Sequence, residues 1–315
     1  MGSVDKPTGL SARASLHART PETPMTSGCC GPTIDAGVVT SAPSRVARAS
    51  HAVHQQLLSI PGGLAQRGTD RPLIPQDGEG PMQALLIPPF RMSSTVITTR
   101  EFAHFAEQSG YRTDAERRGW SFVFASHHRA APEDVSVIDL PWWYRVFGAN
   151  WTCPYGRGIK ADDEDPVVHV SCADAEAFCG WHGLRLPSEV EWEHAARGGL
   201  MDPIYPWGDR APDDDNFQPC NIWQGQFPTN DLGLDGYRGL APANSFPANG
   251  FGLHNMSGNV WEWTAGMQES NRILKGGSHL CHASYCHRFR IAARMANPPH
   301  MTTSHIGFRV VGDSD

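Results

Sequence analysis

Two cysteines near the C-terminus are the residues of this chain best suited to chemistry. Cys281 and Cys286 lie five residues apart in Lys275–Arg290, a stretch that also contains histidines and arginines. On a strand the two sulfurs would point to opposite faces, and on a helix they would lie far apart around the axis. The thiols can therefore meet only if the backbone turns, and Gly276 and Gly277 permit such irregular geometry.

The spacing of the two cysteines leaves two roles open. A disulfide, or a pair of inert thiols, is sterically possible where the loop turns and is slightly favoured by spacing alone. The alternative is a pair of thiolates that binds a soft ion, and two thiolates suit monovalent copper better than a hard cation. Neighbouring histidines and arginines would favour thiolate formation. Zinc would need two more ligands from elsewhere in the chain.

Two segments rich in oxygen atoms could bind a hard cation. The first begins at Asn221, contains Asp235 and ends at Tyr237; in the second, Asn255 and Glu262 flank a turn. Calcium takes about six to eight oxygens from carboxylates, amides and carbonyls. Ordinary turn chemistry explains the same residues, because Asn, Asp and Gly are common in turns for local reasons. Both interpretations stay open, and neither segment has the residue order of an EF-hand.

Composition and charge exclude several classes of protein. The chain has 315 residues, of which 40 % are hydrophobic and 19 % charged, enough to bury a core in one large domain or two small ones. A formal net charge of −7 argues against nucleic-acid binding, which needs a basic surface. No apolar run approaches the roughly 18 residues of a membrane helix. We expect a soluble protein without nucleic-acid or membrane partners, and a monomer.

The first 56 residues differ in composition from the rest. Residues 1–56 are rich in Ala, Ser and Pro and contain no apolar secretory segment, so they are predicted to form a disordered tail before a catalytic domain at 57–313. The eight cysteines include no C-x-x-C pair, and most are expected to be free, half-buried thiols. The missing secretory signal predicts a cytoplasmic location. Cys29 and Cys30 receive no role.

Local signals predict a few regular elements that would position these residues. Residues 82–90 favour a strand, and a helix should begin at the threonines 98 and 99 and end at Gly110. Ser171 and Gly183 delimit a second helix. Ser188 and Glu191 form a capping box for a third, which Gly198 ends. After Gly199 turns and short strands prevail for over a hundred residues, and a long ordered region of that kind usually carries function or ligands.

Several short sequence motifs resemble those of the formylglycine-generating enzymes, also called sulfatase-modifying factors. The similarity runs from about residue 60 to residue 311. The motifs are Ile60–Gly63, Arg185–Glu193, Ala195–Gly199, Asn221–Gly225, Gly258–Trp263, Lys275–Ser278 and Gly307–Arg309. The resemblance implies a single α+β domain similar to C-type lectins, with few short helices and strands and much irregular backbone.

The resemblance also implies an activity and a set of site residues. The activity is a copper-dependent oxidation that converts a cysteine of a sulfatase to Cα-formylglycine with O2 and a thiol reductant. The target cysteine lies in a C-x-P-x-R motif of an extended or unfolded chain. By matching position, Cys281 and Cys286 would bind Cu(I), and Ser278 and His282 would position oxygen or water.

The resemblance implies two structural calcium sites as well. Each combines side chains with backbone carbonyls that match the family by position. The first set is Asn221, Ile222, Asp235 and Tyr237. The second set is Asn255, Gly258, Val260 and Glu262.

The sequence departs from the family at several positions. The segment between Trp263 and Lys275 is shorter than usual, which predicts a trimmed loop near the site. Cys179 matches a position that is disulfide-bonded in secretory members, but its partner position is Val310 here. Ala196 and Ile291 stand at the two positions of a second disulfide of the secretory members. The loss of both disulfides fits a reducing compartment.

Two alternatives to the oxidase remain open. One is a non-catalytic module that binds a peptide or ligand on the same scaffold; non-enzymatic relatives lack the cysteine pair. The other is a relative that joins sulfur to histidine derivatives with non-haem iron. It normally carries an additional N-terminal helical domain, for which residues 1–56 are too short and too polar.

Overall fold

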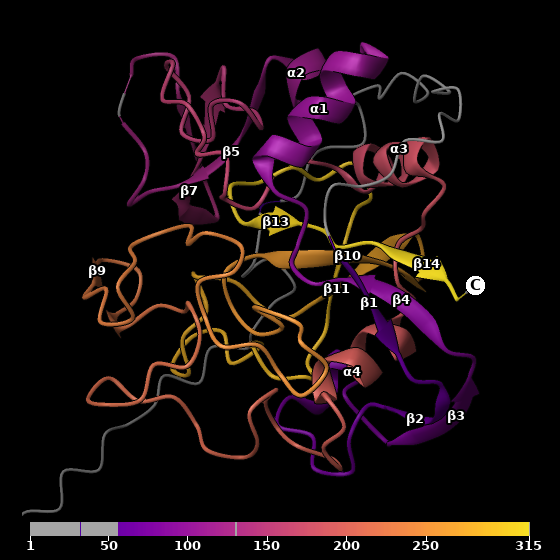
Figure 1. Cartoon of the computed structure of the whole chain (residues 1–315). Helices are drawn as coiled ribbons and strands as arrows, with labels where there is room; N and C mark the ends of the chain where they lie inside the picture. Colours follow the sequence, from indigo (N-terminus) through magenta and orange to yellow (C-terminus); the bar gives the residue numbers. More distant parts are fainter. Residues whose placement is uncertain (1–31, 33–55, 130, 315) are drawn as a thin grey trace, which may run out of the picture.

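Short regular elements joined by long irregular segments make up the fold. The computed structural model describes residue 32, residues 56–129 and residues 131–314, so almost all of the predicted tail lies outside the described part. Within that part, few helices and many short strands confirm the expected α+β class (Figure 1). The helices are α1 (Thr99–Ser109), α2 (Asp114–Arg118), α3 (Cys172–His182) and α4 (Glu189–Arg197), with a 3-10 turn η1 (Pro75–Asp77).

The strands form several small sheets. In spatial order, the sheets of the described residues are β1 (Leu57–Ile60), β4 (Phe90–Ser93) and β14 (Val311–Asp313); β12 (Met295–Asn297), β11 (Asn271–Lys275), β10 (Trp261–Gln268) and β13 (Ile306–Gly307); β5 (Trp120–Phe124), β7 (Leu140–Phe147) and β6 (Val135–Val137); β2 (Gly63–Arg67) and β3 (Gln83–Ile87); and β8 (Gly225–Gln226) and β9 (Asn230–Asp231). Figure 1 shows the segment between α4 and β10, in orange, winding along one side of the molecule with little regular structure.

The sheet around β10 holds the segment that contains the two cysteines. β11 pairs antiparallel with β10 on one side and with β12 on the other. Residues 276–294, which we call the cysteine loop, leave the sheet at the end of β11 and return to it as β12. Both ends of this irregular loop are thus fixed in neighbouring strands.

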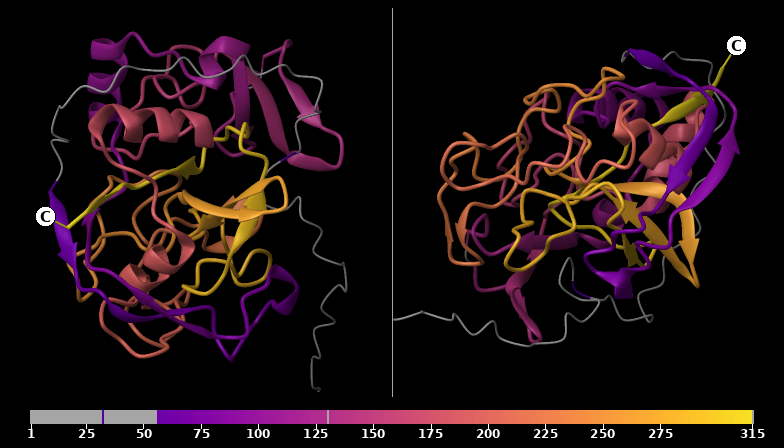
Figure 2. Two further views of the ribbon diagram at one scale, coloured as in Figure 1. Left: turned by 90° about the vertical axis from the view of Figure 1, so that its right-hand side faces the viewer. Right: turned by 90° about the horizontal axis from the view of Figure 1, so that it is seen from below.

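The two ends of the described domain meet in one sheet. β4 lies between β1 and β14 and is antiparallel to both, so Met92 is the partner of Leu58 on one side and of Val311 on the other. Figure 2 shows the C-terminus beside the indigo strand at the start of the domain. The predicted single strand at 82–90 is wrong in extent. Pro88 and Pro89 cannot donate to a ladder, and they separate β3 from β4, which belongs to another sheet.

The predicted helix boundaries are confirmed by the capping contacts. Thr98 and Glu101 form a capping box at α1, and Ser188 and Glu191 form one at α4. The glycines after α1, α3 and α4 adopt the left-handed conformation that ends a helix. Sequence signals without long-range information were therefore sufficient for these elements.

The largest apolar cluster surrounds the cysteines. Cys281 and Cys286 belong to it together with Trp143, Trp261 and Phe289. Five of the six cysteines in the described residues are buried and only one is partly exposed, so the expected half-buried thiols are in fact mostly inside the core. No helix within the described residues is both long and apolar enough to cross a membrane.

Candidate active site

The cysteine loop is fixed where its outgoing and returning parts cross. Gly277 has φ of +72°, which L side chains rarely adopt. A Cβ on Gly277 would lie 2.7 Å from Phe289 Cα, so this crossing has room for glycine only. The Ser257 hydroxyl donates to the Phe289 carbonyl at 2.5 Å on the returning side. Ser278, the next residue of the outgoing part, is thereby held against the rest of the loop.

Two successive turns bring the cysteine sulfurs together. The Cys281 N–H donates to the Ser278 carbonyl at 2.9 Å, and the Cys286 N–H donates to the His282 carbonyl at 2.8 Å. The two Sγ atoms lie 3.4 Å apart, well beyond the disulfide bond length of about 2.05 Å. Cys281 is 1 % exposed and Cys286 2 %. The predicted turn is confirmed, and it places two buried thiols side by side.

The sulfurs line a small cavity whose other walls are mostly aromatic. Ser278 shares the cavity with both cysteines. The Tyr285 ring stacks on the Phe227 ring with centroids 4.0 Å apart, and the Trp143 ring lies 4.9 Å from the His305 ring. The full lining is Phe124, Trp143, Phe227, Ser278, Leu280, Cys281, Tyr285, Cys286 and His305. Such walls keep water away from the sulfurs.

His282 lies apart from this cavity. Its Nδ1 is 2.6 Å from the Ser284 hydroxyl, and its ring borders a neighbouring depression with Asp213 and Gln224. The structure therefore brings three of the four predicted catalytic residues together and leaves His282 outside. The aromatic walls and His305 are not predicted by the sequence motifs. Only Tyr285, which directly precedes Cys286, carried a local signal.

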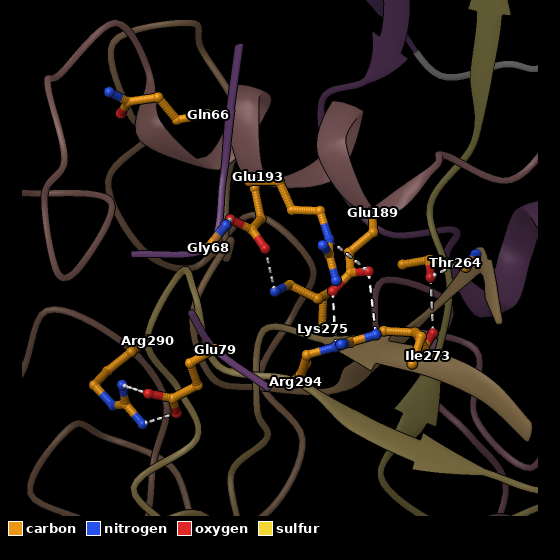
Figure 3. Close-up of polar contacts among 12 residues, drawn as sticks. Gln66, Gly68, Glu79, Glu189, Glu193, Thr264, Ile273, Lys275, Arg290 and Arg294 are labelled. Carbon is orange, nitrogen blue, oxygen red and sulfur yellow. Dashed lines mark hydrogen bonds and ion pairs between the residues drawn. The ribbon is translucent and has the colours of Figure 1, made fainter. Parts of the chain in front are cut away.

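Two arginines after the second cysteine are paired with carboxylates from the segment between β2 and β3. Arg288 forms a bidentate pair with Asp77, with Nε–Oδ2 2.5 Å and Nη2–Oδ1 3.0 Å. Arg290 pairs with both oxygens of Glu79 (Figure 3). Burial alone would raise the pKa of Glu79, but Arg290 and two backbone N–H groups outweigh it and hold that pKa below its usual value.

His287, directly before the first of these arginines, is held neutral. Burial lowers the pKa of His287 to about 4, and the charge of Arg290 adds to the effect. The Tyr205 hydroxyl lies 3.0 Å from His287 Nε2. His287 is therefore an uncharged structural contact at pH 7.

A buried ion pair anchors the start of the cysteine loop. Lys275 Nζ lies 2.8 Å from Glu193 Oε1, and both side chains are almost completely buried. Figure 3 shows this pair beneath α4. Arg197, one turn further along α4, lies 3.2 Å from the other oxygen of Glu193. The end of β11 is thus tied to α4 directly before the two glycines.

The first calcium set is partly assembled. The Asp235 carboxylate accepts the N–H groups of Ile222 at 3.1 Å and Tyr237 at 3.0 Å. The Gln224 amide NH2 donates to both Asp235 Oδ2 and the Ile222 carbonyl, so these two oxygens converge on one point. Burial raises the pKa of Asp235, with the charge of Asp231 adding to it. A buried carboxylate beside a convergent carbonyl fits a hard cation.

The second calcium set fits less well. Asn255 Oδ1 is buried without a hydrogen-bond partner in the described structure, as a ligand oxygen would be. Both oxygens of Glu262, however, pair with Arg309, at 2.6 and 2.8 Å, and Trp192 Nε1 donates to one of them at 2.7 Å. A cation would share this carboxylate with a guanidinium. The side chains of this set do not fit calcium as a set.

The donor set at the cysteines fits Cu(I). Two soft sulfurs 3.4 Å apart in a buried cavity suit a soft ion of low coordination number. No group of three or more His, Cys, Asp or Glu within the described residues could hold a metal ion. A metal at this cavity would therefore have two protein ligands and a position open to a further one.

The fold and the site together define a lectin-like domain of the sulfatase-modifying-factor class with a buried thiol pair. Residues 43–314 match the family described as the sulfatase-modifying factor enzyme 1-like domain, and the chain belongs to this family.

Individual relatives differ in the activity that their names record. The chain is 44 % identical over 294 residues to the formylglycine-generating enzyme of Thermomonospora curvata, covering 84 % of this chain and 96 % of that protein. It is 43 % identical over 267 residues to the inactive C-alpha-formylglycine-generating enzyme 2 of Bos taurus, covering 80 % and 86 %. The solved structure of PvdO from Pseudomonas aeruginosa has a TM-score of 0.61 at 21 % identity, covering 87 % of this chain and all of that one, which shows the shared fold.

Proposed function

We propose that this protein converts a cysteine of a sulfatase to Cα-formylglycine, with Cu(I) bound between Cys281 and Cys286. The observation that carries the proposal is the pair of buried thiols 3.4 Å apart at one small, mostly aromatic cavity. The similarity to a formylglycine-generating enzyme over 84 % of the chain supports the reaction. Overall identity does not decide between an enzyme and an inactive relative, since it is 44 % in one case and 43 % in the other.

The reaction balances with O2 and a thiol as co-substrates. The target CH2–SH group becomes an aldehyde, its C–S bond breaks, and sulfur leaves as hydrogen sulfide. This change removes two electrons from the substrate. Two thiol molecules supply two more and become a disulfide, so that O2 accepts four electrons in all. The net products besides the aldehyde and hydrogen sulfide are one disulfide and one water.

The chain's own residues would bind the substrate and exclude water. When bound, Cu(I) supplies a soft position for the target sulfur and redox chemistry toward O2. Ser278 lies at the cavity, and its hydroxyl accepts the Leu280 N–H at 3.3 Å while its N–H lies 3.4 Å from Cys281 Sγ. Its hydroxyl is thus placed to orient a small molecule beside the sulfurs. His282 has no such position, and its role stays a prediction.

The buried cavity supports an extended substrate. The sulfurs are almost completely covered by aromatic walls, so a target cysteine must enter as a projecting side chain. A flexible chain with a C-x-P-x-R motif can present its cysteine in that way, whereas a cysteine within a folded surface cannot.

The test is a direct assay of the modification. Purified protein loaded with Cu(I) is incubated with a C-x-P-x-R peptide, O2 and a thiol, and mass spectrometry follows the loss of the peptide thiol and the gain of an aldehyde. Cys281→Ser and Cys286→Ser should each abolish conversion while the thermal unfolding curve stays cooperative. Full activity in either variant would refute the proposal. Conversion by neither wild type nor variants, with the peptide still bound, would favour the non-catalytic module.

Calcium, location and oligomeric state complete the proposal. We place a structural calcium ion at Asn221, Ile222, Asp235 and Tyr237, supported by the convergent oxygens there. We also propose a cytoplasmic location, supported by the thiol state of the buried cysteines, and a monomeric state. Cell fractionation and the hydrodynamic mass of the purified protein test these two points.

A further inference from the structure

Two carboxylate–arginine pairs join the same two segments of the chain. Asp77 in η1 and Glu79 just after it approach Arg288 and Arg290 in the cysteine loop, and both pairs span 211 residues of sequence. The segment between β2 and β3 is thereby fastened to the part of the loop that follows Cys286. Figure 3 shows the Glu79–Arg290 pair in its bidentate arrangement.

The two pairs differ in what the arginine reaches on its other side. Arg288 Nη1 lies 3.9 Å from Cys286 Sγ, and the Arg288 side chain is 3 % exposed. Arg290 instead donates from Nε to the His287 carbonyl at 2.7 Å. Arg288 thus connects the Asp77 carboxylate with the Cys286 sulfur. Arg290 connects the Glu79 carboxylate with a backbone carbonyl and reaches no sulfur of the described residues.

We propose that Asp77 is a positioning residue for the Cu(I) site, acting through Arg288 on the sulfur of Cys286. This inference rests on the proposed function. Two thiolates around Cu(I) carry one net negative charge, and the guanidinium donates toward that charge in a site that water does not reach. The bidentate pair with Asp77 fixes the plane of the guanidinium, which a rigid planar fork makes possible.

Two opposing effects follow from removal of the Asp77 charge. Without Asp77 the positive charge of Arg288 would no longer be neutralised by a carboxylate, and this would stabilise the negatively charged Cu(I) bis-thiolate. Without the bidentate partner, however, the guanidinium is no longer fixed, and the Asp77 side chain, 16 % exposed, marks a path along which Arg288 can turn to water. The second effect dominates, because a hydrogen bond toward sulfur needs the donor in place, and a buried guanidinium that has lost a carboxylate partner gains free energy by moving toward solvent.

The test measures Cu(I) affinity by competition with a colorimetric Cu(I) chelator. Partners of metal ligands typically contribute about 10- to 100-fold to metal affinity, so Arg288→Met and Asp77→Asn should each raise the Cu(I) dissociation constant by about that range. The double variant should be no weaker than Arg288→Met alone, since Asp77 acts through the arginine. A thermal unfolding curve of each metal-free variant shows that it is folded.

Glu79→Gln is the matched control. It breaks the neighbouring pair between the same two segments and should lower the unfolding temperature at least as much as Asp77→Asn, because Glu79 is the more buried carboxylate. Its Cu(I) dissociation constant should stay within about threefold of wild type, as expected for a group that reaches no metal ligand. In conversion assays, Asp77→Asn should lower kcat at saturating copper more than it raises KM for the peptide.

The outcomes separate the inference from the proposed function. If wild type binds Cu(I) and Asp77→Asn or Arg288→Met binds it equally well or more tightly, the positioning role is overturned while the proposed function stands. If Glu79→Gln weakens Cu(I) binding as much as Asp77→Asn, the effect is general loosening of the loop and the inference fails. If wild type binds no Cu(I), the copper proposal and this inference fall together.

Discussion

Replacement of Gly277 by alanine tests whether the crossing at the base of the cysteine loop sets the geometry of the sulfurs. Two costs apply at this position. A left-handed backbone costs an L residue about 1–2 kcal/mol, and Gly277 has φ of +72°. In addition, the new Cβ would lie 2.7 Å from Phe289 Cα, 2.9 Å from its Cβ and 3.0 Å from its backbone nitrogen.

The second cost cannot be relieved by a side-chain rotation. The nearest atoms belong mainly to backbone, and Cβ contacts below 3.0 Å are essentially never observed, so the crossing must open from 2.7 Å to at least 3.0 Å. Forced overpacking of this kind costs about 1–3 kcal/mol. The two contributions together predict a loss of about 2–5 kcal/mol in the free energy of unfolding of Gly277→Ala.

Gly110→Ala separates the two costs. Gly110 ends α1 with φ of +67°, and a Cβ there meets nothing within 4 Å. The free energy of unfolding of Gly110→Ala should therefore fall by the backbone cost alone, about 1–2 kcal/mol. Urea unfolding of wild type and both variants gives the difference, which should be about 1–3 kcal/mol. Equal costs for the two variants, within about 0.5 kcal/mol, would refute the claim that the crossing is closely packed.

The same variant should weaken the site. Ser278 directly follows Gly277, and its carbonyl and N–H are the groups that orient Cys281. An opened crossing should therefore raise the dissociation constant for Cu(I) and lower the conversion rate, whereas Gly110→Ala should leave both near the wild-type values. Normal copper binding in a destabilised Gly277→Ala protein would show that the sulfurs are positioned independently of the crossing.

Two further outcomes concern pH and calcium. Burial, with Asp162 nearby, raises the pKa of Asp165 from its ordinary value of 3.8 to about 6; between those values the folded state keeps a proton that the unfolded state loses, so stability falls as pH rises. The free energy of unfolding of Asp165→Asn should therefore exceed that of wild type by about 1 kcal/mol at pH 7, after discounting for partial exposure. Near pH 4 the two proteins should be equally stable. An equal difference at both pH values, measured by urea unfolding, would contradict this. Calcium should raise the wild-type unfolding temperature by a few degrees, as about 2.7 kcal/mol is gained at 100 times the dissociation constant. Asp235→Asn should abolish that rise and the control Asp231→Asn should keep it; a rise that survives in Asp235→Asn would move the calcium site elsewhere.

The helices could be predicted because their signals are local. Ser188 and Glu191 satisfy each other's backbone N–H groups within one turn. At position 198 the backbone is left-handed, a conformation that glycine adopts without steric cost. Neither signal depends on the rest of the chain. The same is true of the turn between Cys281 and Cys286, which follows from the spacing itself.

The walls of the site could not be predicted from local patterns. Phe124 and Trp143 lie on β5 and β7, and they line the cavity with Cys281 through contacts between distant parts of the chain; the Ser304 N–H, just before β13, donates to the Phe122 carbonyl of β5 at 3.0 Å. Nothing within their own segments distinguishes them from ordinary core aromatics. The extent of β3 was misjudged for a related reason. The apolar run continues through Pro88 and Pro89, but the two sides of that break pair with different strands.

Charge partners were equally hidden, and one of them changes the chemistry expected of a predicted ligand. Glu262 was assigned to calcium by position, yet Arg309 takes both of its oxygens across 47 residues of sequence. A carboxylate already paired with a buried guanidinium has less to offer a divalent cation. Position in a motif therefore identifies Asp235 more securely than Glu262.

The construction of the site follows from the spacing of its two sulfurs. No regular element brings residues five apart to one point, so the backbone that carries them cannot be stabilised by a helix or a ladder. Local turns satisfy part of its backbone, and its charges are paired with distant partners: Asp77 for Arg288, Glu79 for Arg290 and Glu193 for Lys275. Those partners come from the segment between β2 and β3 and from α4, so the sulfurs meet only when the entire domain is folded. A peptide spanning the cysteine loop alone should therefore bind Cu(I) far more weakly than the protein, although it contains both ligands.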